Sequence, residues 1–336
     1  MRLREKLVGM TMALIIGGYT RRDDLPAGAP RGLGIYEWDG TTRLAAQLDI
    51  DNPTWFDWDA RRRVLYVSQS NATTLTAVAI PEGPESARIL DTVDTGAEHY
   101  VHLAVAPTGD AVVAACFGEG RVVTVNLADD GRFDGVRGVE SFDGPSDPHQ
   151  ISFGPGGFAV PDRSRGQIHR FSWEAGEAPR LLGSDEMPAG AGPRHMARHP
   201  HRDDVAYLAG EWGNSLVVLR VEEGAFVPVS ELSTLPGDWP HGGDVSAIFV
   251  DAEGARVYVS NRGHDSLAVF DIADPLRPRL ERFIDAGGAT PRYAGELAPG
   301  VLAVAPMDAH AIDVLAGGER TRIPFGAPAC AALVRL

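Results

Sequence analysis

Four residues of this chain combine the chemical properties of a small-molecule site: His149, Arg194, Glu211 and Arg262. A guanidinium group binds a carboxylate or phosphate through two parallel hydrogen bonds, so two converging arginines favour an anionic ligand. A histidine exchanges protons near neutral pH, and a glutamate can orient that histidine or move protons itself. These residue types predict acid–base chemistry on an anionic small molecule.

Three further residues are candidates for binding the same ligand. His195 and His264 flank the two arginines, and Arg292 repeats a Pro-Arg pair further along the chain. The alternative is that each arginine pairs with a neighbouring acid, for which Asp244 and Asp265 are the candidates. Under that alternative the arginines are structural.

These residues lie on a repeat of about 47 residues. Each copy has a β-rich run, a turn with Gly or Asp, a second β-rich run, a polar loop and a third run. Repetition at this period indicates a propeller or a solenoid, and the absence of polar capping repeats favours the propeller. The six complete copies begin near Pro53, His102, Pro148, Pro193, Asp244 and Pro291.

Each period holds about four strands, which is the content of one propeller blade. The segments LIIGGYT (14–20) and GLGIYEWD (32–39) form part of a seventh blade, and ACAALVRL (329–336) is a lone strand that completes it. Pairing of the two chain ends closes the ring and removes an exposed edge. We predict an all-β, seven-bladed β-propeller as a single domain over residues 12–336, preceded by an extension over residues 1–11.

The repeat also predicts where the four residues lie. In an antiparallel hairpin, the start of the first strand and the end of the second strand share one edge. His149 and Arg194 open first strands, whereas Glu211 and Arg262 follow second strands. We therefore expect all four on one face, around the central channel.

Composition argues against several partners. A net charge of −15 disfavours a nucleic-acid surface, which needs basic groups to neutralise phosphates. Two cysteines, Cys116 and Cys330, are too few for a disulfide framework and suit a reducing cytosol. The N-terminal run MRLREKLVGMTMALIIGG mimics a signal peptide, but no small-residue cleavage site follows it. We expect a cytoplasmic protein with no nucleic-acid or membrane partner.

Other reaction types lack their motifs. The sequence contains no G-x-S-x-G, so a serine-hydrolase triad is disfavoured. It contains no H-E-x-x-H and no paired C-x-x-C, and its histidines lack the tight spacing of metal ligands. We expect a site that uses no metal and no cofactor.

The segments GPRH (192–195), SNRGHDSLAVF (260–270), DPHQISF (147–153) and LIIGGYT resemble the bacterial lactonase family of seven-bladed propellers. That family includes the propeller-type 6-phosphogluconolactonase and the fungal carboxy-cis,cis-muconate cyclase. By motif position, the resemblance to the cyclase branch implies an active site of His149, Arg194, Glu211 and Arg262. Two positions depart from the family pattern: Gly210 replaces an Asn before the glutamate, and Ala305–Pro306 replaces an Asn-Gln pair.

The resemblance implies a lactonase that hydrolyses the lactone of an anionic substrate, such as 6-phosphogluconolactone. In this hypothesis Arg194 and Arg262 bind the anion, and His149, assisted by Glu211, activates water. The first alternative is a cyclase or isomerase of an unsaturated acid, in which the same groups steer a carboxylate onto an alkene. The second is a propeller that binds a ligand without turning it over.

Overall fold

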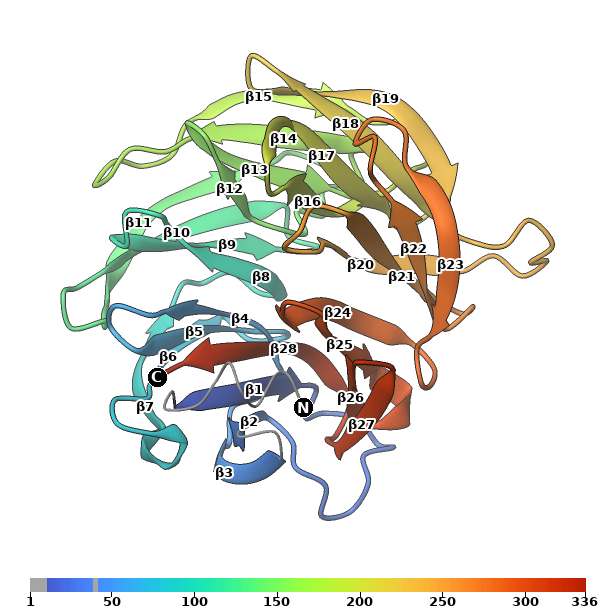
Figure 1. The fold of residues 1–336 in the computed structure, drawn as a ribbon. Helices are drawn as coiled ribbons and strands as arrows, with labels where there is room; N and C mark the ends of the chain where they lie inside the picture. The colour runs from blue at the N-terminus through green and yellow to red at the C-terminus, as the bar shows by residue number, and fades with distance from the viewer. Residues whose placement is uncertain (1–10, 39–41) are drawn as a thin grey trace.

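The computed structural model describes residues 11–38 and 42–336, which form 28 strands in seven four-stranded sheets around a central axis (Figure 1). We number the sheets as blades in chain order. Within each blade the strands are antiparallel neighbours, and the first strand lies next to the axis. The predicted seven-bladed β-propeller is therefore confirmed.

The first four blades cover the N-terminal half of the ring together with the last strand of the chain. Blade 1 consists of β28 (Pro328–Arg335), β1 (Met12–Gly18), β2 (Leu33–Trp38) and β3 (Thr42–Leu48). Blade 2 consists of β4 (Pro53–Asp59), β5 (Val64–Gln69), β6 (Thr74–Ala79) and β7 (Arg88–Asp94), with the short helix η1 (Pro84–Ser86). Blade 3 consists of β8 (Tyr100–Val105), β9 (Ala111–Cys116), β10 (Arg121–Leu127) and β11 (Phe133–Ser141). Blade 4 consists of β12 (Ser152–Gly154), β13 (Gly157–Asp162), β14 (Gln167–Ser172) and β15 (Leu181–Glu186).

The remaining three blades complete the ring. Blade 5 consists of β16 (Pro193–His199), β17 (Arg202–Gly210), β18 (Ser215–Glu222) and β19 (Ala225–Ser233). Blade 6 consists of β20 (Asp244–Val250), β21 (Arg256–Arg262), β22 (Ser266–Asp271) and β23 (Arg279–Asp285). Blade 7 consists of β24 (Pro291–Ala298), β25 (Val301–Pro306), β26 (Ala311–Ala316) and β27 (Glu319–Pro324), with the short helix η2 (Met307–Ala309).

The burial of each strand follows its place in the blade. Second strands such as β5 (VLYVSQ) and β9 (AVVAAC) are buried along their whole length, because both faces of the sheet pack on neighbouring blades. Outermost strands such as β7 (RILDTVD) carry the charged residues and are largely exposed. The core therefore lies between the blades, as in the cluster of Tyr66, Leu103 and Val112 between blades 2 and 3.

The ring closes by pairing of the two chain ends. Strand β1 pairs antiparallel with β28 from Met12↔Arg335 to Gly17↔Cys330, as the leftover C-terminal strand predicted. The predicted extension over residues 1–11 falls outside the described residues, except for Thr11. In the part of the chain described, no helix has the length and apolar character needed to cross a membrane.

Candidate functional site

A β-bulge recurs at the same place in five of the inner strands. The pairing of each inner strand with its second strand skips one residue directly after the strand's first position, for example between Pro193↔Gly210 and His195↔Ala209. A bulge of this kind re-aims the skipped side chain. The five skipped residues are Thr54, Val101, Arg194, Arg292 and Ala329.

The skipped residues meet at the axis. All five line one cavity of about 20 Å³, together with Trp55, His149 and His195. We call it the axial cavity. Its volume suits about one water molecule. Blades 4, 5 and 7 supply its histidines and arginines, whereas blades 1, 2 and 3 contribute the uncharged residues Ala329, Thr54, Trp55 and Val101. The bulges therefore bring side chains of different chemical type to the axis, so the site lacks the sevenfold symmetry of the repeat.

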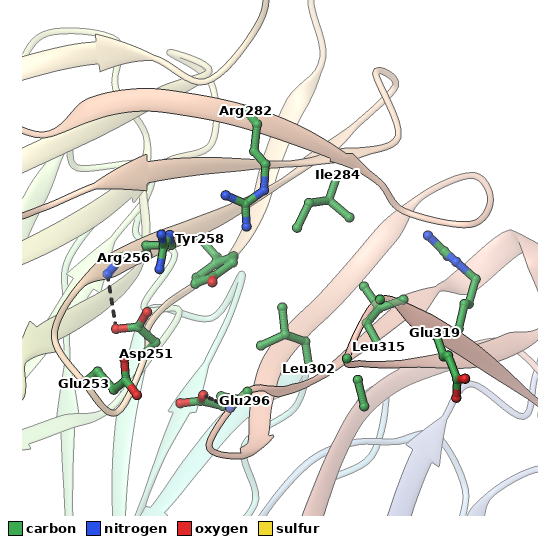
Figure 2. A pocket seen from close by; sticks show the side chains of 15 residues that line it. Asp251, Glu253, Arg256, Tyr258, Arg282, Ile284, Glu296, Leu302, Leu315 and Glu319 are labelled. Carbon is green, nitrogen blue, oxygen red and sulfur yellow. Dashed lines mark hydrogen bonds between the residues drawn. The ribbon is translucent and has the colours of Figure 1, made fainter. Parts of the chain in front are cut away.

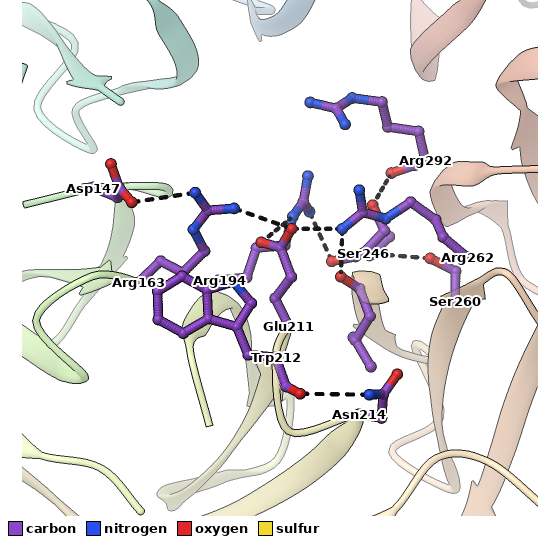
Figure 3. Close-up of polar contacts among 12 residues, drawn as sticks. Asp147, Arg163, Arg194, Glu211, Trp212, Asn214, Ser246, Ser260, Arg262 and Arg292 are labelled. Atoms are coloured by element: carbon purple, nitrogen blue, oxygen red, sulfur yellow. Dashed lines mark hydrogen bonds and ion pairs between the residues drawn. The ribbon is translucent and has the colours of Figure 1, made fainter. Parts of the chain in front are cut away.

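Beside the cavity, one carboxylate lies among three guanidinium groups (Figure 3). Glu211, directly after β17, has its Oε1 2.6 Å from Arg262 Nη2 and 3.2 Å from Arg163 Nη1. Its Oε2 is 3.5 Å from Arg194 Nε. Arg194 also donates from Nη1 to the carbonyl oxygen of Ser246, at 2.7 Å. We call Arg163, Arg194, Glu211 and Arg262 the arginine–glutamate cluster.

Glu211 and Arg194 stay charged although both are buried. Burial raises the pKa of Glu211, but Arg194, Arg262 and Arg163 together lower it below its usual value. Burial lowers the pKa of Arg194 to about 9, while Glu211 acts in the opposite direction. Both groups therefore remain charged at neutral pH. Arg163 and Arg262 are the more exposed members, and their side chains reach solvent.

Two histidines, His149 and His195, line the cavity, and each has a buried ring nitrogen that forms no hydrogen bond within the described residues. His149 precedes β12, and its backbone N–H donates to the Pro161 carbonyl oxygen at 2.9 Å. Among the described residues, no group hydrogen-bonds to His149 Nδ1 or His195 Nε2, although both atoms are buried. The two rings lie edge to face with centroids 5.1 Å apart. Burial, followed by the positive charge of Arg194, lowers the pKa of both histidines well below 6.5. Both imidazoles are therefore neutral at pH 7, and each has a ring nitrogen that can hydrogen-bond to a water molecule in the axial cavity.

Arg292 brings a further positive charge to the cavity. Its guanidinium lies over the ring of Tyr19, with the central carbon 5.4 Å from the ring centroid. Within residues 11–38 and 42–336, no carboxylate forms an ion pair with it, and Figure 3 draws no polar contact between this guanidinium and Glu211. Arg292 is thus positioned to meet an anion.

His264 and the two acids proposed as arginine partners lie elsewhere. His264 Nδ1 is 2.7 Å from Ser266 Oγ, and its ring packs on Trp239 at 4.6 Å; it is not among the cavity-lining residues. Asp265 accepts hydrogen bonds from the backbone of Gly263 and Thr290. In the described structure both Arg194 and Arg262 pair with Glu211, and no ion pair joins them to Asp244 or Asp265.

Sequence reasoning did not single out several of these residues. Arg163 follows the second strand of its blade just as Glu211 does, so the repeat contained a signal for it. Trp55 and His102 stack at 4.3 Å and pack against His195, but nothing in the sequence pairs residues from blades 2, 3 and 5. Tyr19 belongs to the LIIGGYT segment, yet its place under Arg292 depends on ring closure.

A much larger cavity, of about 490 Å³, lies between blades 6 and 7 (Figure 2). It begins at the Asp251–Gly254 turn, which is the opposite end of β20 and β21 from Arg262. Apolar side chains such as Tyr258 and Leu302 line it, and its rim arginine Arg256 pairs with Glu281 at 2.7 Å. We assign the candidate site to the axial cavity despite its smaller volume, because unpartnered titratable groups converge there.

The described residues contain no group of three or more His, Cys, Asp or Glu side chains arranged to hold a metal ion. The donor set at the axial cavity consists of arginines, which repel cations, and neutral histidines that lie beside them. This chemistry suits an anionic ligand.

Comparisons with known proteins agree with the fold. The family described as "Lactonase, 7-bladed beta-propeller" matches residues 13–316. An uncharacterized protein of Lactococcus lactis subsp. cremoris is 27% identical over 292 residues, covering 81% of each chain. The 6-phosphogluconolactonase of Bacillus subtilis is 41% identical over 92 residues, covering 27% of this chain and 26% of that protein.

Solved structures share the architecture at low identity. The periplasmic gluconolactonase PpgL of Pseudomonas aeruginosa has a TM-score of 0.86 at 20% identity, covering 96% of this chain and 99% of that one. A protein from Lactobacillus plantarum also has a TM-score of 0.86, at 23% identity, with 97% and 100% covered. These structures show a common fold.

Proposed function

The chain belongs to the lactonase family of seven-bladed β-propellers, and we propose that it hydrolyses the lactone of a substrate that carries a carboxylate or a phosphate. The excess of positive charge at and beside the axial cavity carries this proposal. Arg194 and Arg262 share the single carboxylate of Glu211, and Arg292 adds a charge with no described acidic partner. An anion supplies the missing negative charge.

Hydrolysis requires a water molecule to attack the lactone carbonyl carbon. In our proposal His149 accepts a proton from this water as the new C–O bond forms, because its imidazole is neutral and its Nδ1 has no hydrogen-bond partner among the described residues. The carbonyl oxygen becomes an oxyanion, which Arg194 stabilises. The ring C–O bond then breaks, and the ring oxygen takes the proton from His149. The product is a hydroxy acid.

The remaining residues have supporting roles in this proposal. His195 lies 5.1 Å from His149, ring to ring, and orients the same water. Arg292 and Arg262 bind the substrate anion, since both side chains are partly exposed. Glu211 contacts arginines rather than His149 in the described structure, so we assign it to orienting Arg194 and Arg262. The guanidinium groups supply the positive charge, and we propose that the reaction requires no metal.

A sugar lactone such as 6-phosphogluconolactone is the substrate that we propose. The names of the Bacillus subtilis and Pseudomonas aeruginosa proteins support this choice, because both describe gluconolactone-type substrates. We propose the cytoplasm as the location, since Cys116 and Cys330 are buried free thiols rather than a disulfide.

The test is a substrate panel with the purified full chain. Gluconolactone, 6-phosphogluconolactone generated in situ, and a carboxymuconate are compared, each above its spontaneous rate. We expect hydrolysis of the phosphorylated lactone and a loss of about 100-fold or more in kcat for His149→Gln, because general base catalysis contributes this much. His201→Gln, an exposed histidine outside the site, is the matched control.

The other outcomes each have a clear meaning. Turnover of the muconate alone favours the cyclase alternative. Binding of an anion without turnover of any member favours the non-catalytic alternative. Full lactonase activity in His149→Gln contradicts the proposed role of this histidine.

A further inference from the structure

Arg163 is the one member of the arginine–glutamate cluster with no part in the proposed chemistry. It lies in the loop after β13 and reaches across to blade 5. Its Nη1 donates to Glu211 Oε1 at 3.2 Å, and its Nη2 donates to Asp147 Oδ2 at 3.2 Å. One guanidinium thus bridges two carboxylates on neighbouring blades (Figure 3).

Aromatic rings hold this guanidinium in place. Its central carbon is 4.5 Å from the ring centroid of Phe117 and 5.2 Å from that of Trp212. Contacts of this kind favour a cation and restrict its orientation. Phe117 follows β9 of blade 3 and Trp212 follows Glu211 in blade 5, so the side chain of Arg163 links three blades. A side chain fixed in this way can fix the carboxylate that it contacts.

The two carboxylate oxygens of Glu211 contact different arginines. Arg163 and Arg262 share Oε1, which leaves Oε2 facing Arg194 Nε at 3.5 Å. A buried carboxylate with fewer cations beside it binds a proton more readily, and a protonated or rotated Glu211 no longer aligns the two arginines. Asp147 balances the charge of Arg163 itself, so Arg163 anchors Glu211 without competing for a substrate anion.

We propose that Arg163 is a positioning residue that holds Glu211 ionised and oriented, so that Arg194 and Arg262 stay aligned on the substrate anion. The role of Arg163 in turnover rests on the proposed function, whereas its role in anion affinity stands separately. Arg163 is not assigned contact with the substrate. It acts through its contact with Glu211, which in turn contacts Arg194 and Arg262.

The experiment uses Arg163→Met, Arg163→Lys and the matched control Arg165→Met in the full chain. Arg165 lies in the same loop and interacts with Asp162 at 3.9 Å and with the Asp143 carbonyl oxygen, not with Glu211. Circular dichroism and thermal melting establish that each variant is folded. Calorimetry with inorganic phosphate then measures anion affinity, and kcat/KM for 6-phosphogluconolactone is measured against pH.

For Arg163→Met we expect phosphate affinity and kcat/KM to fall by about tenfold each, which corresponds to 1.4 kcal/mol. We also expect the acid limb of the pH profile to move to higher pH, because Glu211 binds a proton more easily without this cation. Arg163→Lys restores the charge, so its phosphate affinity and kcat/KM should lie within about threefold of the wild-type values, although lysine lacks the forked geometry that bridges two acids. Arg165→Met should match the wild type in both measurements.

Phosphate affinity and an acid limb unchanged in folded Arg163→Met overturn the proposal. If Arg163→Met does not fold, Arg163→Gln replaces it, and a folded Arg163→Gln with unchanged phosphate affinity and an unchanged acid limb also overturns the proposal. If the wild type binds phosphate but hydrolyses no lactone, the proposed function fails, and phosphate affinity alone decides the role of Arg163. A wild type that neither binds phosphate nor hydrolyses lactones refutes both proposals.

Discussion

Glu211 Oε1 and Arg262 Nη2 lie 2.6 Å apart although they belong to different blades, and this ion pair joins the ends of β17 and β21. The glutamate is nearly inaccessible, whereas the arginine keeps 17% of its side chain exposed. The pair therefore runs from the buried side of the site toward solvent. Arg262 can therefore face a ligand while the more buried Glu211 balances its charge.

Replacing Glu211 by Gln should destabilise the protein strongly. The substitution keeps the shape but leaves Arg163, Arg194 and Arg262 without their shared carboxylate, and breaking a buried pair costs about 3–5 kcal/mol. Urea unfolding measures the change. Glu222→Gln is the control, because its pair with Arg220 is about half exposed and such surface pairs contribute about 0–1 kcal/mol. A free energy of unfolding for Glu211→Gln within 1 kcal/mol of the wild type contradicts a tightly coupled cluster.

Replacing Arg292 by Met should weaken anion binding without loss of stability. The guanidinium has no described carboxylate partner to lose, and it lies over Tyr19 at the axial cavity. We expect KM for the phosphorylated lactone to rise about tenfold, as for a lost charge-assisted contact. Arg88→Met on the exposed strand β7 changes the net charge equally, so it separates the local effect from the overall charge. Equal KM values for the two variants argue against Arg292 as a ligand-binding residue.

Activity should persist below the ordinary titration range of histidine. His149 must be neutral to accept a proton, and burial together with Arg194 lowers its pKa well below 6.5. The fraction of neutral His149 therefore stays high as the pH falls from 8 through 6.5. We expect kcat/KM to be flat over this range and to decline only below it. An acid limb centred near 6.5 indicates a different, more exposed base.

Stability should instead decrease as the pH falls below 6.5. In the unfolded chain His102, His149 and His195 bind protons with a pKa near 6.5, whereas in the folded protein burial lowers the pKa of His102 to about 3 and those of the other two well below 6.5. The unfolded state then binds more protons, so acid favours it. Each histidine contributes up to about 1.4 kcal/mol per pH unit between 6.5 and its folded pKa.

Urea unfolding at pH 8, 7, 6 and 5 measures this dependence. His102→Gln removes one titrating group and should flatten the slope below pH 6.5, whereas exposed His201→Gln should not. A slope that is the same in all three proteins refutes the assignment to the buried histidines.

Replacing Gly17 by Ala should strain the closure of the ring. A Cβ at this position would lie 2.3 Å from the Pro53 carbonyl oxygen and 2.9 Å from Cys330 Sγ, so blades 1 and 2 must separate. Overpacking of this kind costs about 1–3 kcal/mol, measured by thermal or urea unfolding. Gly237→Ala is the control, since a Cβ there meets no atom within 4 Å. No difference between the two variants contradicts tight contact at the closure.

The sequence determined the propeller and the face of the site, because both follow from local periodicity. A repeat of about 47 residues fixes the number of strands per blade, and the positions of Arg194 and Glu211 in their hairpins place both at one strand edge. The closing pair β1–β28 was predictable for a similar reason, since two unpaired segments remained at the chain ends.

Only the tertiary structure decided which groups meet. Side chains that are far apart in sequence converge through contacts between blades, and these contacts leave no periodic signal in the sequence, although the β-bulges that aim the side chains recur with the repeat. Thus Glu211 pairs with three arginines instead of with His149, Arg163 joins the cluster, and His264 packs on Trp239. A repeat specifies the position of a residue within its own blade, but the curvature of the closed ring decides its neighbours across the axis.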